Sequence, residues 1–164
     1  MSDDTKKTLG VFAKAVRDLL RDKALADIDP GEPAIVGRLR DLVRDKYEGW
    51  SIDTEWDRYE QFTKRLDYEL SGKGRRIIPD LIVHIMGRKE NLLVVEVKKA
   101  ANKNYDGDIW KLKGMTEVAG KYAYSVGLHL VLDVKNGTAP GCDVYVDAAV
   151  DKELTEWMRS ALDG

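Results

Sequence analysis

Two apolar segments separated by a short polar turn constrain the fold of this chain most strongly. Residues 76–86 and 92–98 are rich in Ile, Leu and Val, and the turn between them, residues 87–91, reads Gly-Arg-Lys-Glu-Asn. Runs of this kind joined by a short Gly-containing loop are typical of a β-hairpin. The second segment is apolar on both faces, as expected for a strand that is covered on both sides. The sequence therefore predicts a central hairpin in a sheet flanked by helices.

The segments around the hairpin alternate between helical and strand periodicity. We expect helices at residues 8–24, 33–47, 58–70, 106–118 and 148–162, and strands at residues 50–56, 76–86, 92–98, 124–134 and 142–146, the last a short edge strand. This order predicts a mixed α/β fold. The 164 residues suit a single domain spanning the whole chain.

Composition excludes several classes of protein. The single cysteine, Cys142, allows no intramolecular disulfide and argues against a cysteine-based zinc site. The longest apolar run, residues 81–85, is interrupted by His84, whereas a membrane span needs about 20 apolar residues. The N-terminus lacks the basic and apolar regions of a signal peptide, so we expect a cytoplasmic protein with no membrane partner.

Charge is distributed unevenly along the chain. The whole sequence has a formal net charge of -2, which argues against a general nucleic-acid coat protein. Residues 71–113, however, hold ten basic and five acidic residues, a net charge of +5, and the rest of the chain holds -7. A local basic field on an acidic body attracts a polyanion, although runs of charge are also typical of solvated surfaces.

Three polar residues converge at one end of the predicted hairpin. Asp80 follows Pro79 at the start of the first strand, and Glu96 and Lys98 lie at the end of the second. In a hairpin these two strand ends are neighbours, and alternate strand residues such as Glu96 and Lys98 face the same side. Two carboxylates and an ammonium are therefore expected within a few ångströms of each other.

The cluster of Asp80, Glu96 and Lys98 is costly to bury unless it is paired or binds a cation. Mg²⁺ uses one or two carboxylates, keeps several waters and accepts further oxygen ligands, here the backbone carbonyl of Val97. A bound metal would lower the pKa of a water, and Lys98 would orient that water or stabilise developing negative charge. The alternative is an ordinary cross-strand salt bridge between Lys98 and Glu96 or Asp80.

The pattern Pro79-Asp80, followed by Glu96-x-Lys98, resembles the PD-(D/E)xK signature of the restriction-endonuclease-like nuclease superfamily, in particular its bacterial members. The resemblance implies an αβββαβ core, which maps onto residues 32–134, with extra helices at both ends of the chain. It also implies a Mg²⁺- or Mn²⁺-dependent nuclease in which Asp80 and Glu96 hold the metal and Lys98 is the catalytic lysine.

Glu32 and Lys111 extend the site that the resemblance implies. Many members carry an additional site glutamate on the first core helix, which corresponds to Glu32, and Glu32 continues the inward stripe of its helix. The alternative for Glu32 is a carboxylate that complements the helix dipole or forms a capping box with Asp29. Lys111 lies on the expected crossover helix, where it would point toward the site or a phosphate, or would pair with Asp108.

The function expected from these features is metal-dependent hydrolysis of phosphodiester bonds by a DNA endonuclease. The alternative is a catalytically inactive domain of the same fold that binds nucleic acid or protein. The first and last helices either cover the sheet or form the face of a homodimer. His84 either borders the site or is structural, and His129 is expected to be structural. The basic residues expected to contact phosphates without reading bases are Lys73, Arg75, Arg76, Lys99, Lys103 and Lys111.

Overall fold

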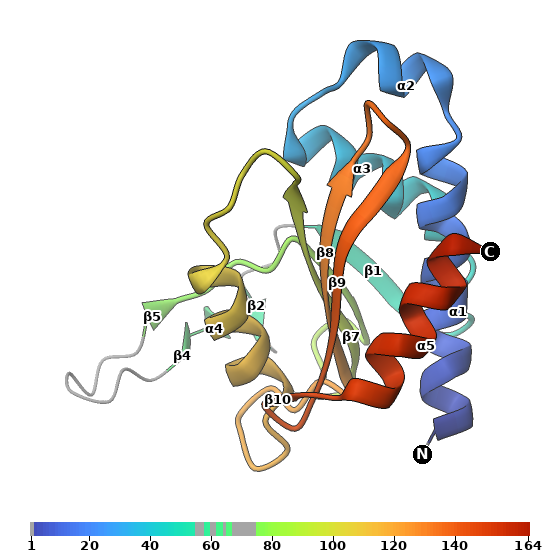
Figure 1. Ribbon diagram of the computed structural model, residues 1–164. Helices are drawn as coiled ribbons and strands as arrows, with labels where there is room; N and C mark the ends of the chain where they lie inside the picture. The colour runs from blue at the N-terminus through green and yellow to red at the C-terminus, as the bar shows by residue number, and fades with distance from the viewer. Residues whose placement is uncertain (1, 55–57, 60–61, 64, 67–74) are drawn as a thin grey trace.

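A six-stranded mixed sheet forms the centre of the computed structural model, which describes residues 2–54, 58–59, 62–63, 65–66 and 75–164 (Figure 1). The strands, in their order across the sheet, are β1 (Ser51–Thr54), β6 (Leu81–His84), β7 (Asn91–Lys99), β8 (Val126–Asp133), β9 (Thr138–Val146) and β10 (Ala149–Val150). β7 and β8 pair in parallel, and the other neighbouring pairs of this sheet are antiparallel. The predicted hairpin is the pair of β6 and β7.

Helices cover both faces of this sheet. They are α1 (Ser2–Leu20), α2 (Lys23–Ile28), α3 (Glu32–Val43), α4 (Asp106–Thr116) and α5 (Lys152–Asp163). α1, α3 and α5 lie on one face and α4 lies on the other (Figure 1). α4 also connects β7 to β8, which supplies the crossover that two parallel strands need. The predicted mixed α/β fold is confirmed, and within the described residues no helix is long and apolar enough to cross a membrane.

The central strand β7 is buried on both faces because its side chains alternate between two cores. Leu93, Val95 and Val97 pack in the core beneath α1, α3 and α5, whereas Val94 packs in the core beneath α4. Glu96 is fully buried on this strand, so a charged side chain interrupts an otherwise apolar run. The apolar character that identifies this strand in the sequence therefore reflects helices on both sides.

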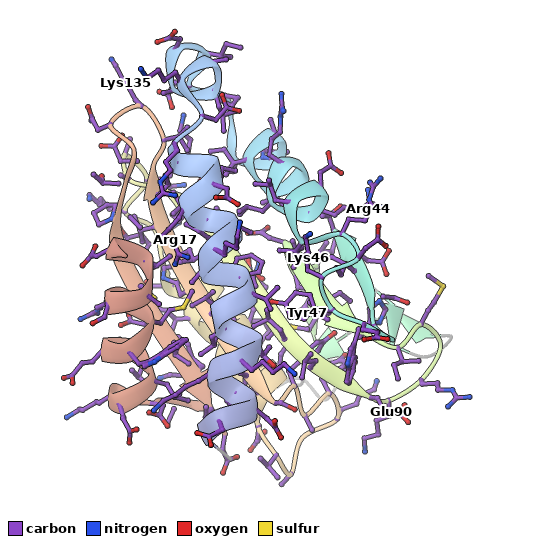
Figure 2. All side chains as sticks on the ribbon, turned by 90° about the vertical axis from the view of Figure 1, so that its right-hand side faces the viewer. Arg17, Arg44, Lys46, Tyr47, Glu90 and Lys135 are labelled. Atoms are coloured by element: carbon purple, nitrogen blue, oxygen red, sulfur yellow. The ribbon has the colours of Figure 1, made fainter. Side chains whose placement is uncertain are left out.

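The helix α1 lies between α5 and α3 (Figure 2), and it is hydrogen-bonded to α5 and to the segment that follows α3. The hydroxyl of Tyr47, which follows α3, donates a buried hydrogen bond of 2.9 Å to the backbone carbonyl of Thr8. The guanidinium of Arg17 donates to the backbone carbonyl of Ala161 in α5. The first and last helices thus form one layer over the sheet, which is one of the two roles predicted for them.

In the middle of the chain, one predicted helix is wrong and one predicted strand is shorter than expected. Residues 58–70 were expected to form a helix, but their described residues form short strands. The strand expected at residues 76–86 joins the central sheet only at Leu81, after Pro79, which has no N–H to donate to a ladder. The short strands are β2 (Arg58–Tyr59), β3 (Phe62–Thr63) and β4 (Arg65–Leu66), with β5 (Arg75–Arg76) as the partner of β4.

Elements near the C-terminus have different bounds from those predicted. β9 begins at Thr138, directly after a turn in which Gly137 has a φ of 68°, and it is a nine-residue strand instead of a short one. The last helix begins at Lys152, later than predicted, because Asp151 caps it: the Asp151 carboxylate accepts a hydrogen bond from a first-turn N–H at 2.9 Å. Local capping, which apolar periodicity does not report, sets this boundary.

Candidate functional site

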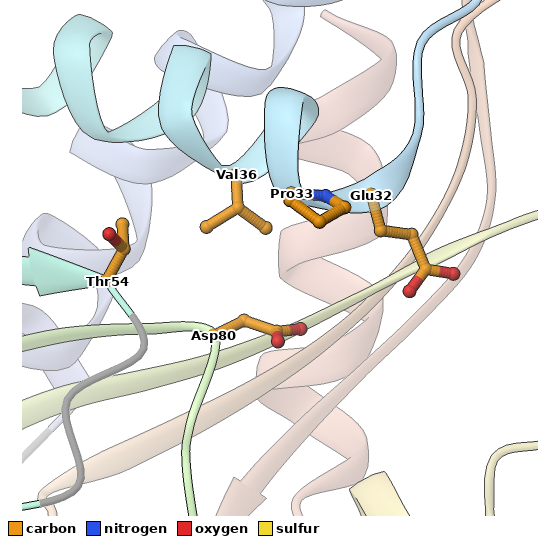
Figure 3. Close-up of a pocket in the computed structure, with 5 residues that line it drawn as sticks. All are labelled: Glu32, Pro33, Val36, Thr54 and Asp80. Atoms are coloured by element: carbon orange, nitrogen blue, oxygen red, sulfur yellow. The ribbon is translucent and has the colours of Figure 1, made fainter.

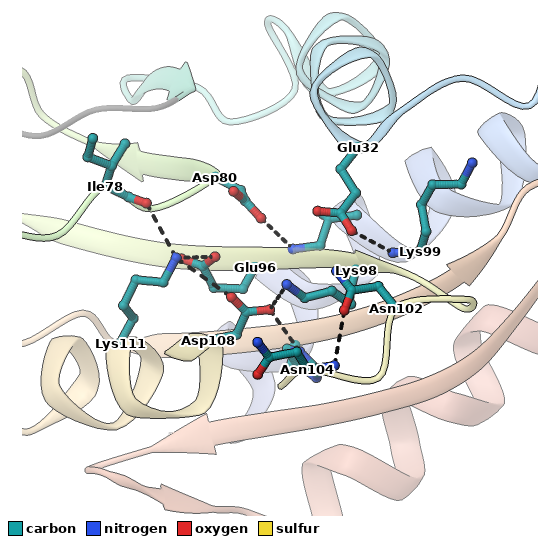
Figure 4. A network of polar contacts seen from close by, with 12 residues as sticks. Glu32, Ile78, Asp80, Glu96, Lys98, Lys99, Asn102, Asn104, Asp108 and Lys111 are labelled. Atoms are coloured by element: carbon teal, nitrogen blue, oxygen red, sulfur yellow. Dashed lines mark hydrogen bonds and ion pairs between the residues drawn. The ribbon is translucent and has the colours of Figure 1, made fainter. Parts of the chain in front are cut away.

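At the open end of the central hairpin, the side chain of Asp80 takes the place of a backbone hydrogen-bond acceptor. Leu81 of β6 lies opposite Val95 of β7, and Asp80 lies just before this pairing begins. Oδ2 of Asp80 accepts a hydrogen bond of 2.8 Å from the backbone N–H of Val97 (Figure 4). Asp80 is thereby held beside Glu96, and the two carboxylates that were predicted to converge lie close enough to affect each other's pKa.

The two oxygens of the Glu96 carboxylate have different surroundings. Oε2 lies 2.8 Å from Nζ of Lys111, which comes from α4. Oε1 is buried and has no hydrogen-bond partner among the residues that the structure describes. Leaving a buried carboxylate oxygen without a partner costs free energy. Glu96 therefore offers an oxygen that a cation or a hydrogen-bond donor would stabilise.

Burial is the largest influence on the pKa of both carboxyl groups. Burial raises the pKa of Asp80, although the N–H of Val97 and the ammonium of Lys111 oppose the rise. Burial and then the nearby Asp80 raise the pKa of Glu96 well above its usual range, against the opposing effect of Lys111. These directions are those expected for two like charges in a poorly solvated place. A bound cation would favour the ionised form of both groups.

Asp108, in the first turn of α4, lies among three cationic or basic groups (Figure 4). Its Oδ2 is 3.2 Å from Nζ of Lys98 and 3.4 Å from Nε2 of His129, and its Oδ1 is 3.7 Å from Nζ of Lys111. Lys98 therefore forms an ion pair with Asp108, whereas the salt bridge considered from the sequence was with Glu96 or Asp80. Lys111 pairs with Asp108, as one alternative predicted, and it also reaches Glu96.

Opposite charges nearby favour the ionised forms of Asp108 and Lys111. Burial raises the pKa of Asp108, but His129, Lys98 and Lys111 outweigh it, so the net pKa is lowered. Burial lowers the pKa of Lys111, but Glu96 and the other nearby carboxylates outweigh it, so its net pKa is raised. Lys111 is therefore a permanent cation beside Glu96 at neutral pH.

Glu32 is the first residue of α3 and takes part in a backbone contact instead of a capping box. The N-cap is Gly31, and Asp29 belongs to the preceding helix end, so the capping-box interpretation is wrong. Oε1 of Glu32 accepts a hydrogen bond of 3.2 Å from the backbone N–H of Lys99. The ammonium of Lys99 lies 2.9 Å from Oδ1 of Asp29, which fastens the loop before α3 to the end of β7.

Glu32 and Asp80 line the same pocket, which lies between the start of α3, the end of β1 and the start of β6. The pocket has a volume of about 160 Å³, and the two carboxylates extend into the space below the first turn of α3 (Figure 3). Both of these residues receive hydrogen bonds from the edge of β7, at Lys99 and at Val97. Because the N–H and C=O of one strand residue point to the same edge, the carbonyl of Val97 faces this side as well.

The residues present fit a divalent cation held by few protein ligands. Within the described residues, no group of three or more His, Cys, Asp or Glu side chains is assembled as a ready metal cage. Mg²⁺ commonly binds through one or two carboxylates and keeps several waters. Asp80 and the unpartnered oxygen of Glu96 form such a pair, with the Val97 carbonyl and Glu32 at the same edge.

Of the six basic residues predicted to contact nucleic acid, the structure describes the side chains of three. Lys73 lies outside the described residues, as do the side chains of Arg75 and Arg76. Lys103 is exposed on the loop between β7 and α4. Lys99 and Lys111 are both engaged in ion pairs, with Asp29 and Glu96 respectively.

The role of Asp108 as a partner of Lys98 was missed in the sequence. Asp108 lies four residues before the buried Leu112, so its helix position places it on the inward face with that residue. His129 is buried and structural, as predicted, and lies opposite Glu96 in β8. His84 is also buried, and its Nε2 lies 2.7 Å from Oδ2 of Asp53, a contact that supports its structural interpretation.

Comparisons with protein-family models, with curated proteins and with solved structures found no match for this chain. Two neighbouring carboxylates, one of them with a buried oxygen that has no partner among the described residues, lie beside two lysines at the edge of β7. This arrangement suits the binding of a cation and, through the lysines, of an anion.

Proposed function

We propose that the protein is a metal-dependent phosphodiesterase that cleaves DNA, with its site at Asp80 and Glu96. The observation that carries the proposal is the buried Oε1 of Glu96, which has no partner among the described residues and belongs to a carboxylate beside Asp80. Uncompensated buried charge is expensive, and a divalent cation compensates two carboxylates at once. Substrate phosphate oxygens are common further ligands of Mg²⁺ in proteins.

Asp80 and Glu96 would hold Mg²⁺ or Mn²⁺, with the Val97 carbonyl and Glu32 as further oxygen donors. When bound, the metal would lower the pKa of a coordinated water and polarise a phosphorus–oxygen bond of the phosphodiester. Asp80 is oriented for this role by its hydrogen bond from Val97, and Glu32 by its hydrogen bond from the backbone of Lys99. These backbone contacts fix the carboxylates without using their remaining lone pairs.

The lysines supply positive charge next to the carboxylates. Lys98, held by Asp108, would position the attacking water or stabilise the charge that develops on the phosphate. The exposed Lys103, together with Lys99, lies on the loop side of the site and would contact the backbone of the nucleic acid. The net charge of +5 over residues 71–113 favours a polyanionic substrate.

The order of elements supports a restriction-endonuclease-like core as part of this proposal. Between residues 32 and 133, the main-sheet strands and the helices follow one another as α3, β1, β6, β7, α4 and β8, which matches αβββαβ when the short strands between β1 and β6 are set aside. α1, β9, β10 and α5 then lie outside the core. The proposed acidic residues fall where β6 begins and where β7 ends.

The test measures metal binding and cleavage on the same samples. Mn²⁺ is titrated calorimetrically into wild type, Asp80→Asn and Glu96→Gln, and nicking of supercoiled DNA is followed with added Mg²⁺ or Mn²⁺. We expect wild type to bind and nick, and both variants to lose both properties while keeping the wild-type circular dichroism spectrum. Asp41→Asn, on the exposed side of α3, makes the same change of charge and serves as the control. Nicking that survives in either site variant overturns the mechanism.

The ion pair of Glu96 with Lys111 favours a second candidate function, a binding module without catalysis. The ammonium already neutralises part of the acidic charge without a metal. This candidate predicts salt-dependent binding of DNA that is unchanged by a chelator, with no cleavage.

A structured RNA of equal length, assayed beside the DNA, tests the substrate class of the proposed nuclease. Preferential cleavage of the RNA contradicts the assignment to DNA.

A further inference from the structure

We propose that the ammonium of Lys111 is a built-in counter-ion that competes with the divalent cation for Glu96, so that it sets the metal affinity of the site. The inference rests on the proposed function and goes beyond it, because it assigns to a residue of the crossover helix control over when the site is loaded. It follows from the contacts of Lys111 and Glu96 and from the groups around them.

The position of Lys111 is that of a cation bound to the carboxylate. Its Nζ lies 2.8 Å from Oε2 of Glu96, whose side chain is only 1% exposed. This is the distance of a strong charge-assisted hydrogen bond. The interaction joins α4 to β7 across the interior, and it leaves Oε1 of the same carboxylate without a partner among the described residues. One cation thus occupies one half of a carboxylate that a metal would share.

Lys111 has other acceptors to which its ammonium can move. The same Nζ lies 3.7 Å from Oδ1 of Asp108 and 3.4 Å from the backbone carbonyl of Ile78 (Figure 4). Its side chain is 19% exposed, so it reaches the surface of the site as well as the buried carboxylate. A lysine has a long flexible stem, and a small rotation exchanges Glu96 for these acceptors or for a phosphate oxygen.

The charges decide the direction of the effect. Asp80 and Glu96 attract a divalent cation, and an ammonium that touches Glu96 repels it and uses one of its ligand atoms. Replacing Lys111 by a neutral residue of similar length removes the repulsion and frees Oε2. In the metal-free variant, the negative charge of Asp80 and Glu96 has lost the neighbouring ammonium. In the metal-bound variant, the metal neutralises that charge. Metal binding should therefore be tighter in the variant.

The decisive experiment is calorimetric titration of Mn²⁺ into wild type and Lys111→Met at neutral pH. We expect the variant to bind Mn²⁺ about tenfold more tightly, because the repulsion is removed and Oε2 of Glu96 is freed. A tenfold change corresponds to about 1.4 kcal/mol of binding free energy. Lys113→Met is the matched control, because Lys113 is an exposed lysine in the last turn of the same helix, and we expect its affinity to change less than about threefold. Lys111→Arg keeps the charge and should bind as wild type does.

Thermal unfolding gives a second measurement that does not depend on activity. Without metal, Lys111→Met should unfold at a lower temperature than wild type, and saturating Mn²⁺ should raise its Tm by more than it raises that of wild type. Lys111→Gln removes the charge but keeps a hydrogen-bond donor, and it replaces Lys111→Met in both measurements if the latter does not fold.

The outcomes separate this inference from the proposed function. Binding of Mn²⁺ by wild type with unchanged or weaker binding by Lys111→Met overturns the inference and leaves the metal site standing. Binding by the variant alone supports the inference strongly. Absence of binding in wild type and in all folded variants, including those without the ammonium, overturns the inference and the proposed function together, since no metal site then exists.

Discussion

The side chain of Asp80 takes the place of a backbone acceptor for Val97, with Oδ2 of its carboxylate 2.8 Å from the Val97 nitrogen. This hydrogen bond gives the Val97 N–H an acceptor beyond the start of β6, and it also fixes Asp80 beside the buried Glu96. This backbone contact thus places two carboxyl groups together. Burial raises the pKa of both, and the nearby Asp80 raises that of Glu96 further. The expected consequences can be measured in the metal-free protein.

The stability of metal-free wild type should fall relative to that of Glu96→Gln as the pH rises. The pKa of Glu96 in the folded protein lies well above the ordinary value of 4.5, so the folded state holds its proton after the unfolded state has released it. Above about pH 4.5, ionisation therefore costs folded-state free energy that the variant does not lose. Urea denaturation in a chelator, from about pH 4 to about pH 8, measures the difference. Glu156→Gln, an exposed change on α5, should show no such slope.

Asp108→Asn should destabilise the protein by about 1–3 kcal/mol at neutral pH, because Lys98 and His129 lose their charged partner. The net pKa of Asp108 is lowered, so its contribution is present above the ordinary value of 3.8 and is lost as the pH falls through the folded value. Urea denaturation should show the gap closing in acid. Asp106→Asn, in the same helical turn but exposed, should change stability by less than about 0.5 kcal/mol.

Gly127→Ala should destabilise the protein by about 1–3 kcal/mol through overpacking between α4 and β8. A Cβ at Gly127 would lie 2.8 Å from Cγ2 of Thr116 and 3.2 Å from Cδ2 of Leu112, both on α4. Gly37→Ala is the matched control, since its Cβ would meet nothing within 4 Å and it lies inside α3. That change should stabilise the protein by about 0.5–1 kcal/mol, so thermal unfolding should show opposite signs for the two variants.

Glu32→Gln should weaken Mn²⁺ binding by about tenfold without unfolding the protein. The amide oxygen still accepts the hydrogen bond from the Lys99 backbone, so only the charge facing the pocket with Asp80 is lost. Calorimetry measures the affinity and circular dichroism checks the fold. Asp29→Asn alters the partner of the Lys99 ammonium instead, and it should leave the affinity within about twofold. Equal affinities for Glu32→Gln and wild type would show that Glu32 only fastens α3.

Much of the fold was predictable because the signals are local. The apolar runs on either side of residues 87–91 predicted the hairpin, and the register of a hairpin brings Asp80 next to Glu96. The bounds of several elements were not predictable from apolar spacing, since capping sets them, as Asp151 does for α5. The helix expected at residues 58–70 failed because periodicity in a short mixed segment does not separate helix from strand.

The sequence by itself determined the layered α/β architecture and the meeting of Asp80 with Glu96, because alternation and hairpin pairing follow from backbone geometry over a few residues. Only the tertiary structure decided which lysine meets which carboxylate. Strand alternation places Lys98 on the same face of β7 as Glu96. The position of α4 over β7 and β8, however, pairs Lys98 with Asp108 and Lys111 with Glu96. That position depends on packing between segments far apart in the chain, including the close approach at Gly127, which no local pattern specifies.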